Sequence, residues 1–254
     1  MKMLYGLIGM SMFGFSTLLN ATSLYQENND WHGIVGVGSI VRTEPYQNIN
    51  ARILPFPYVI MRRGSFFIEG LEIGYRVVEG NQATFDVILT PRLEGFDADE
   101  GAIFNDLEDR DFSLDGGIAT GWRQGTIEFN LSAVTDLLHK SDGKEIKASV
   151  GKTYILTGKM TLITPSIGVK WKSENLVNYY YGITPIQENT NRPIYTGKAT
   201  LNYIAAMDAT YSLTKRSTLF AGVEYEQFGD DISDSPLVEG EKIISVFLGY
   251  GWQF

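Results

Sequence analysis

The sequence predicts an all-β fold, a closed antiparallel transmembrane β-barrel of ten or twelve strands. Three observations lead to this prediction. The chain begins with an export-type segment, apolar and polar residues alternate through most of the remainder, and the last strand ends on an aromatic residue, Phe254. After the first segment no stretch is apolar for long enough to cross a membrane as a helix.

Residues 1–21 have the pattern of a secretory signal peptide. Lys2 supplies an early positive charge, an apolar run follows, and Ala21 stands just before a polar stretch. A membrane-anchoring helix is the alternative, but glycines interrupt the run, which is shorter than the roughly 20 apolar residues of a span. We therefore expect residues 22–254 to form the mature barrel.

Alternation recurs in segments of about ten residues, the length that a tilted strand needs to cross a bilayer. Successive side chains of a strand point to opposite sides, so each segment has one apolar and one polar face. Eleven segments fit this pattern: Val35–Val41, Pro57–Met61, Leu71–Val77, Phe85–Leu93, Phe112–Trp122, Ile127–Ala133, Ile146–Leu156, Ile163–Trp171, Ala199–Leu213, Leu219–Tyr225 and Ile244–Phe254.

An antiparallel barrel whose two ends lie on the same side needs an even number of strands. Either Pro57–Met61 is not a separate strand, which gives ten, or Asn178–Ile183 is an additional one, which gives twelve.

Alternation alone does not say which face looks outward, because soluble sandwiches and lipocalin-like barrels also alternate. The apolar face of Ile243–Phe254 is continuous and aromatic, without the Lys or Pro that interrupts an exposed edge strand in a soluble protein. Together with the export segment, this indicates that the apolar faces contact lipid. Aromatic residues near segment ends form the predicted membrane girdle: Trp122, Trp171, Tyr211, Tyr250, Trp252 and Phe254.

Connector lengths predict the orientation, because barrels of this kind have short periplasmic turns and longer external loops. The short turns are Arg123–Gly125, Thr157–Lys159 and Thr214–Ser217, and the long connectors are Phe96–Asp109, Leu138–Lys144, Ser173–Ile194 and Gly229–Glu241. The periplasmic turns carry four cations that we expect to face an acidic partner surface: Arg123, Lys159, Lys215 and Arg216.

Charged residues of both signs alternate with the apolar faces and are expected to point inward. In a barrel of this size we expect them to pair and fill the lumen rather than line a wide channel. They are Arg76, Asp86, Arg92, Asp115, Arg123, Glu128, Lys170, Lys198, Asp208 and Glu224. For Tyr179–Tyr181 we favour packing at the girdle or the barrel rim over a ligand-stacking platform.

Composition excludes several functions. The formal charge of -9 becomes -10 when Lys2 leaves with the signal, and no basic cluster is present, so nucleic acid is not an expected partner. The chain has no cysteine, which excludes disulfides, thiolate metal sites and a cysteine nucleophile. We expect no cofactor.

We also expect no catalytic residue and no metal site. His32 and His139 are the only imidazole bases, and three residues in a strand would place Asp136 and His139 on opposite faces. The acidic connector from Asp97 to Asp111 lacks calcium-loop spacing and is expected to be a solvated loop, with weak divalent binding to lipopolysaccharide phosphates as the alternative.

Several short motifs are spread over nearly all of the mature chain. They are Leu54-Pro55, Arg110 followed by Ser113-Leu114-Asp115 and Gly117, Asp136 with His139, Tyr179-Tyr180-Tyr181-Gly182, Asp234-Ser235-Pro236-Leu237-Val238 and the ending Gly249-Tyr250-Gly251-Trp252-Gln253-Phe254. In order and spacing they resemble the MipA/OmpV family of outer-membrane proteins, also described as MltA-interacting proteins. Lys140-Ser141-Asp142, after His139, departs from the family pattern.

The resemblance implies an outer-membrane barrel whose relatives scaffold a murein hydrolase and a murein synthase, or act as antigens, adhesins or determinants of antibiotic susceptibility. The expected partners are outer-membrane lipid, lipopolysaccharide and murein enzymes. We expect a non-enzymatic scaffold. A narrow channel for small polar or cationic solutes and an adhesin acting through Ser173–Ile194 are the alternatives.

Overall fold

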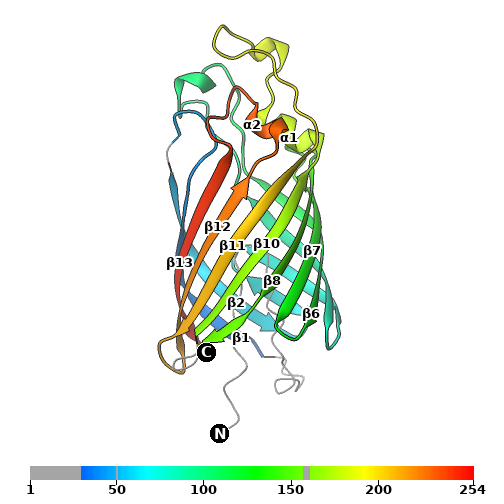
Figure 1. Cartoon of the computed structure of the whole chain (residues 1–254), viewed down its shortest axis with the longest axis vertical. Helices are drawn as coiled ribbons and strands as arrows, with labels where there is room; N and C mark the ends of the chain where they lie inside the picture. The colour runs from blue at the N-terminus through cyan, green and yellow to red at the C-terminus, as the bar shows by residue number, and fades with distance from the viewer. Residues whose placement is uncertain (1–29, 50, 157–160) are drawn as a thin grey trace.

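The computed structural model describes residues 30–49, 51–156 and 161–254. Within these ranges the chain is a closed antiparallel barrel (Figure 1). Consecutive strands pair in sequence order, β13 pairs with β1, and β10 pairs with β11 to complete the wall. β8 and β9 both pair with β10 and therefore occupy one strand position. The wall consequently has twelve strand positions.

The strands are long on average and tilted, as a bilayer crossing requires. They are β1 (His32–Arg42), β2 (Arg52–Arg63), β3 (Phe66–Glu69), β4 (Glu72–Glu79), β5 (Ala83–Arg92), β6 (Ser113–Gln124), β7 (Ile127–Asp136), β8 (Lys144–Lys152), β9 (Tyr154–Leu156), β10 (Thr161–Lys172), β11 (Thr200–Ser212), β12 (Ser217–Gln227) and β13 (Lys242–Gln253). The loops hold α1 (Glu174–Tyr181), α2 (Asp230–Ser233) and two 3-10 turns, Ala102–Phe104 and Pro185–Gln187. Among the described residues, no helix combines the length and apolarity of a membrane-spanning helix.

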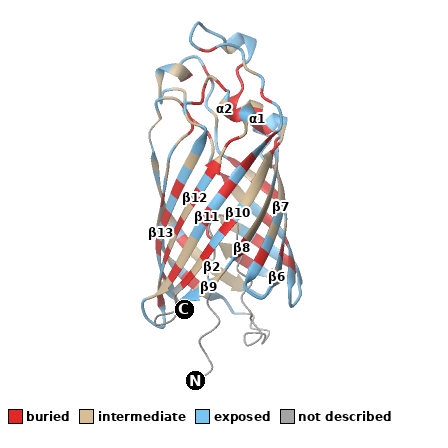
Figure 2. Cartoon of the chain, viewed as in Figure 1, coloured by how far each residue is buried: buried red, intermediate tan, exposed pale blue. Residues whose placement is uncertain are grey.

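The predicted alternation is confirmed, with the apolar faces outside. In β11, Asn202 and Ile204 are buried in the barrel while Leu201 and Tyr203 are exposed on its outer surface. Figure 2 shows this alternation of buried and exposed residues along the front strands. The outer surface is therefore built for a hydrocarbon solvent and the inner one for polar contacts.

Twelve is the correct one of the two predicted strand counts, but the additional strand is not the one expected. Asn178–Ile183 is not a strand, because most of it lies in α1, whose Tyr180 and Tyr181 are buried under the loops. The additional strand is β3, four residues long and too short to show a period of two. Pro57–Met61 is the second half of β2.

One end of the barrel carries the short turns and the carboxyl terminus, and we call it the terminal end. Gln253 N donates to Arg216 O at 2.7 Å, and Phe254 N donates to Gly33 O at 3.1 Å. The four long connectors gather at the opposite end, the loop end (Figure 1). The predicted signal at residues 1–21 and the turn Thr157–Lys159 lie outside the described residues.

The wall narrows at the hairpin of β3 and β4. Cross-strand partners Phe67 and Gly74 both point inward, and the Phe67 ring lies over Gly74. A Cβ atom added at Gly74 would stand 2.0 Å from Phe67 Cζ. Glycine is therefore required at residue 74 because the ring occupies the space of a side chain.

We expect Gly74→Ala to lower the free energy of unfolding by about 1–3 kcal/mol, the usual cost of overpacking. Urea unfolding of the refolded barrel, followed by tryptophan fluorescence, measures the change. Gly240→Ala is the matched control, since its nearest heavy atom is Lys242 O at 3.8 Å. Phe67→Leu should restore part of the loss, and equal effects at residues 74 and 240 would contradict the packing argument.

Candidate functional site

A network of ion pairs fills the lumen near the loop end. Arg92 at the end of β5 contacts Asp115, and its Nη1 lies 2.9 Å from Glu145 Oε2 and 3.3 Å from Glu94 Oε1. Lys172 Nζ binds Glu94 Oε1 at 2.7 Å. Burial alone would raise the pKa of Glu94, but Lys172 and Arg92 outweigh it and hold that pKa below its ordinary value.

The same polar lining continues around the barrel in separate pairs. Lys170 Nζ and Asn202 Nδ2 each lie 2.6 Å from the Glu226 carboxylate, which therefore joins β10, β11 and β12. Three further pairs are Arg76–Asp86, Arg123–Glu128 and Lys147–Glu224. The predicted filling of the lumen by paired charges is confirmed for these residues.

One inward charge predicted from the alternation is wrong, and four charges of the lumen were not predicted. Lys198 is wrong as a lumen residue, because it precedes β11 and is exposed. Glu94, Glu145, Lys172 and Glu226 were missed, although Glu145, Lys172 and Glu226 share the strand parity of the predicted inward residues.

The lumen beside β1, β2, β12 and β13 is apolar instead. Ile34, Ile40, Tyr58, Phe220 and Phe247 form a buried cluster there. The Tyr58 ring lies 4.6 Å from that of Phe220 and 5.4 Å from that of Phe247, centre to centre. The barrel interior is therefore divided into a charged part and an apolar part.

A second apolar cluster closes the loop end, and we call it the cap. It joins residues of the loops after β1, β5, β10 and β12, among them Tyr46, Phe96, Phe104, Leu176, Tyr181, Phe228 and Leu237. Tyr46 stacks on Tyr181 at 5.7 Å, and Phe96 stacks on Phe104 at 4.4 Å. Burial raises the pKa of the Tyr46 hydroxyl and that of the Tyr181 hydroxyl well above the ordinary value for tyrosine.

Arg192 ties one long loop into the cap. The side chain is 1% exposed and donates to Gln187 O at 2.8 Å, Ile103 O at 2.5 Å and Asn105 O at 3.0 Å. These bonds join the loop after α1 to the loop after β5. Because a buried guanidinium needs such acceptors, Arg192 fixes the two loops against each other.

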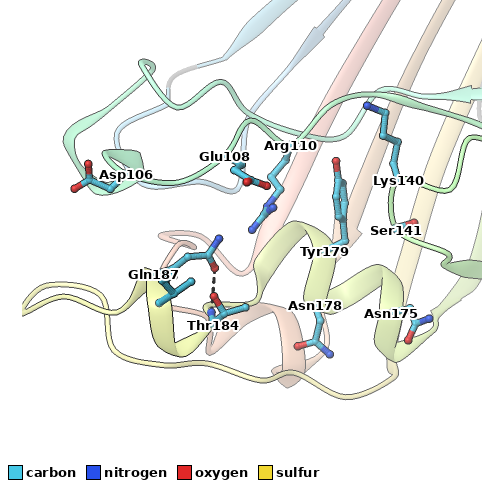
Figure 3. A pocket seen from close by; sticks show the side chains of 11 residues that line it. Asp106, Glu108, Arg110, Lys140, Ser141, Asn175, Asn178, Tyr179, Thr184 and Gln187 are labelled. Carbon is cyan, nitrogen blue, oxygen red and sulfur yellow. Dashed lines mark hydrogen bonds between the residues drawn. The ribbon is translucent and has the colours of Figure 1, made fainter.

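Above the cap lies an outer cleft of about 710 Å³. Figure 3 shows Arg110 between Glu108 and Tyr179, with Lys140 and Ser141 on the Tyr179 side and Gln187 and Thr184 below Glu108 and Arg110. The Arg110 guanidinium lies over the Tyr179 ring at 5.3 Å. Tyr180 and Tyr181 pack in the cap, so the rim-packing interpretation holds for them, while Tyr179 lines the cleft.

Among the described residues, no hydroxyl of the cleft is hydrogen-bonded to an imidazole base. Ser141 Oγ donates to Asp136 Oδ2 at 3.0 Å, while His139 is exposed and lies 2.6 Å from Asp142 Oδ1. Asp136 also accepts bonds from Ser113 and from the backbone N–H groups of Leu138 and Ser141, so this carboxylate organises the loop. Hydrogen bonding to Asp142 raises the pKa of His139.

In the described part of the chain, acidic side chains of the connector from Asp97 to Asp111 make contacts that hold the loops in place. Asp109 Oδ1 accepts from Ala98 N at 2.7 Å, and Glu100 Oε2 pairs with Arg52 at 2.6 Å. No three acidic or histidine side chains of the described residues are placed to hold a metal ion.

The residues predicted for the membrane girdle do not all lie at one end of the barrel, and the cations predicted for the turns do not all lie in turns. Trp122, Tyr250, Trp252 and Phe254 are exposed near the terminal end, Tyr211 is half-buried at the same end, and Trp171 is half-buried near the loop end. Lys215 and Arg216 are exposed in the turn after β11, Arg123 lies within β6 and binds Glu128 at 2.9 Å, and Lys159 lies outside the described residues. The girdle and the partner surface remain predictions.

Comparison with known proteins gives one family and several relatives. A family model described as MltA-interacting protein MipA matches residues 35–254. The chain is 25% identical to the MltA-interacting protein of Escherichia coli (strain K12), over 93% of the chain and 96% of the relative. It is also 25% identical to the putative outer membrane protein YiaT of that strain, over 87% and 90%.

A more distant relative and a solved structure complete the comparison. Outer membrane protein OmpV of Vibrio cholerae is 21% identical, over 92% of the chain and 90% of the relative. The solved structure is an outer membrane channel from Pseudomonas putida F1. The aligned region covers 88% of this chain and 95% of the channel's chain, with 12% sequence identity and a TM-score of 0.43.

We expect Arg92→Met to lower the free energy of unfolding by about 3–5 kcal/mol, because it leaves the carboxylates of Glu94, Asp115 and Glu145 buried without this cation. Lys140→Met is the matched control at the exposed pair with Asp111, where about 0–1 kcal/mol is expected. Urea unfolding in detergent micelles measures both. Similar losses for the two variants would show that the lumen network is not a buried structural element.

Proposed function

Because the chain belongs to the MltA-interacting protein MipA family of outer-membrane proteins, we propose that it is a non-enzymatic scaffold that holds cell-envelope proteins at the outer membrane. Its relatives are named as outer-membrane or interaction proteins. On this proposal the barrel supplies a fixed location and two exposed ends, and the chemistry belongs to the partner.

The observation that carries the proposal is the obstructed lumen. Arg92, Lys172 and their carboxylates occupy the interior near the loop end, and the cap packs above them. Charges held in these short pairs offer no free site to a passing ion near the loop end, and a cluster of apolar side chains lies along the side of the lumen formed by β1, β2, β12 and β13. A barrel filled in this way acts through its surfaces, which disfavours the alternative of a narrow channel.

The partner surface proposed is the terminal end. Lys215 and Arg216 are exposed there, next to the carboxyl terminus, whereas most acidic loop residues lie at the opposite end. Cations at a rim attract an acidic surface and increase the rate of association. The relative named MltA-interacting protein supports a murein-related protein, such as a murein hydrolase, as the class of partner.

The loop end favours a second candidate, adhesion. Leu176, Val177 and Tyr181 of the loop Ser173–Ile194 belong to the cap, but the loop's tip at Pro185–Gln187 projects beyond it, and Ile186 is 95% exposed. An isolated apolar side chain at a projecting tip is suited to contact with another surface. Deletion of this tip should abolish host-matrix binding if the loop is an adhesin.

We expect the purified barrel to be silent in planar bilayers from pH 7 to pH 5. The pKa of Glu94 is lowered in the folded state, so its stabilising contribution is present above the ordinary carboxyl pKa. That contribution is lost only as the pH falls through the lower, folded value. A porin inserted into the same membranes controls for detection, and conductance steps from the folded protein would refute the sealed lumen.

We expect Lys215→Glu with Arg216→Glu to weaken binding of a purified murein hydrolase by roughly tenfold, with lower salt dependence, as charge reversal at a rim does. The assay uses the full barrel in lipid nanodiscs. Lys198→Glu at the loop end is the matched control and should bind as the unmodified protein does. If the double variant bound the murein hydrolase as tightly as the unmodified protein does, Lys215 and Arg216 would not be part of the partner surface.

A further inference from the structure

The barrel wall is incomplete between β2 and β5. β3 pairs with β2 only over Ile60–Arg63, and the hairpin turns at Gly70, whose N–H donates to Val59 O at 2.8 Å. Residues 52–58 of β2 have no strand beside them on this side within the described chain. On the far side, β4 reaches β5 only up to Leu89.

The gap is closed above, so it is a window rather than an open seam. Arg52 at the top of β2 pairs with Glu100 at 2.6 Å, and Arg42 Nη2 donates to Leu93 O at 3.0 Å. These contacts bring the loop after β5 against the tops of β1 and β2. The window is bounded by β2, the hairpin turn, the end of β5 and this loop.

Three prolines stand on the two open edges of the window. Val59 O faces the hairpin, so in the alternating strand the backbone polar groups of residues 57, 55 and 53 face the gap. Gly80 N donates to Ala83 O, which by the same alternation turns the nitrogen of Pro91 toward the gap. Pro55, Pro57 and Pro91 therefore remove backbone donors where no strand could accept them.

This arrangement leaves more backbone acceptors than donors facing the gap, because only residue 53 among residues 53, 55 and 57 keeps its N–H group. The carbonyl groups of Ile53, Pro55 and Pro57 face the gap and have no backbone donor among the described residues. Prolines also prevent another strand from pairing at this edge. The window consequently favours a ligand that donates hydrogen bonds over a further β-strand.

The inner side of the window is apolar. Leu54 and Phe56 point inward but remain half-buried, whereas Ser245 and Phe247, which point inward from the fully paired β13, are buried. Next to them Tyr58 is 0% exposed, and its hydroxyl has no hydrogen-bond partner among the described residues. An apolar surface and an unsatisfied buried hydroxyl thus lie behind the opening.

Two carboxylates stand at the lower border. Glu69 and Glu72 lie directly opposite each other at the tip of the hairpin and share the inward face of Ile60. Arg62 reaches Glu69 only at 4.0 Å, and no salt bridge forms at Glu72 within the described chain. Like charges directly opposite each other repel, so a cation placed between them would be held favourably.

We propose that this window binds an amine-bearing amphiphile that enters from the bilayer. Its primary ammonium group donates to Glu69, Glu72 and the carbonyl edge of β2, and its apolar chain lies against Leu54 and Phe56. An ammonium has three donors and no acceptor, which matches a border with carboxylates and carbonyl groups. A carboxylate head group of the same chain length is excluded by repulsion.

The test uses three photoreactive single-chain amphiphiles of equal length, with amine, alcohol or carboxylate head groups and a diazirine on the chain. The full barrel is labelled in phosphatidylcholine nanodiscs, and modified peptides are identified by mass spectrometry. We expect the amine to label Leu54, Phe56 or Tyr58 at least fivefold more than the carboxylate does. If labelling were confined to outward residues, such as those of Leu219–Tyr225 in β12, the proposed binding of an amphiphile in the window would be refuted.

Glu69→Gln with Glu72→Gln tests the head-group site. This double variant should lose the preference for amine over alcohol while the chain still labels Leu54 and Phe56. Glu79→Gln, at the other end of β4, is the matched control and should keep the preference. Folding of each variant is checked by its heat-dependent electrophoretic shift. A preference that survives the double substitution would overturn the assignment of the two carboxylates.

Discussion

Every backbone N–H and C=O within hydrocarbon must find a partner inside the protein, and most of the structure follows from this constraint. Closure of β13 on β1 supplies partners to both terminal strands. The position of each strand proline follows from it as well. Pro165 stands where β8 gives way to β9, and Pro55, Pro57 and Pro91 stand on edges that no strand covers. A proline in a fully paired position would leave a neighbouring carbonyl without its donor.

Turning the apolar faces outward leaves the interior polar, and that fixes what the barrel can do. Buried charges are costly unless they are paired, so Arg92, Lys170 and Lys172 each have a carboxylate partner from another segment of the chain. The same pairs hold the wall together and obstruct the lumen. A barrel stabilised by its contents has little room for transport, and its remaining surfaces for recognition are the two ends and the break in the wall.

The sequence could predict features that depend on a repeated local pattern. Each of the eleven predicted segments corresponds to a separate strand position of the wall, because a period of two maintained over many residues is unambiguous. β3 was not predicted because four residues are too few to show a period, and Asn178–Ile183 was predicted as a possible strand where loop packing makes a helix. The role of Arg192 could not be predicted, since its acceptors Ile103 and Asn105 are distant in sequence. Pairing of the lumen charges was predictable in kind, but partners such as Lys172 and Glu94 depend on barrel register.

The window is where the backbone constraint is relaxed, and the manner of relaxation restricts what can fill it. Shortening β3 and β4 exposes two strand edges, and proline substitution for an ordinary residue removes N–H groups but leaves every C=O in place. The result is an edge with more acceptors than donors beside an apolar inner surface, with Glu69 and Glu72 beneath it. Water could satisfy the carbonyl groups but would not favour contact with Leu54 and Phe56, and a hydrocarbon chain alone would do the reverse. A molecule that satisfies both has a donating head and an apolar body, which is why the two halves of the site argue for a single amphiphilic occupant.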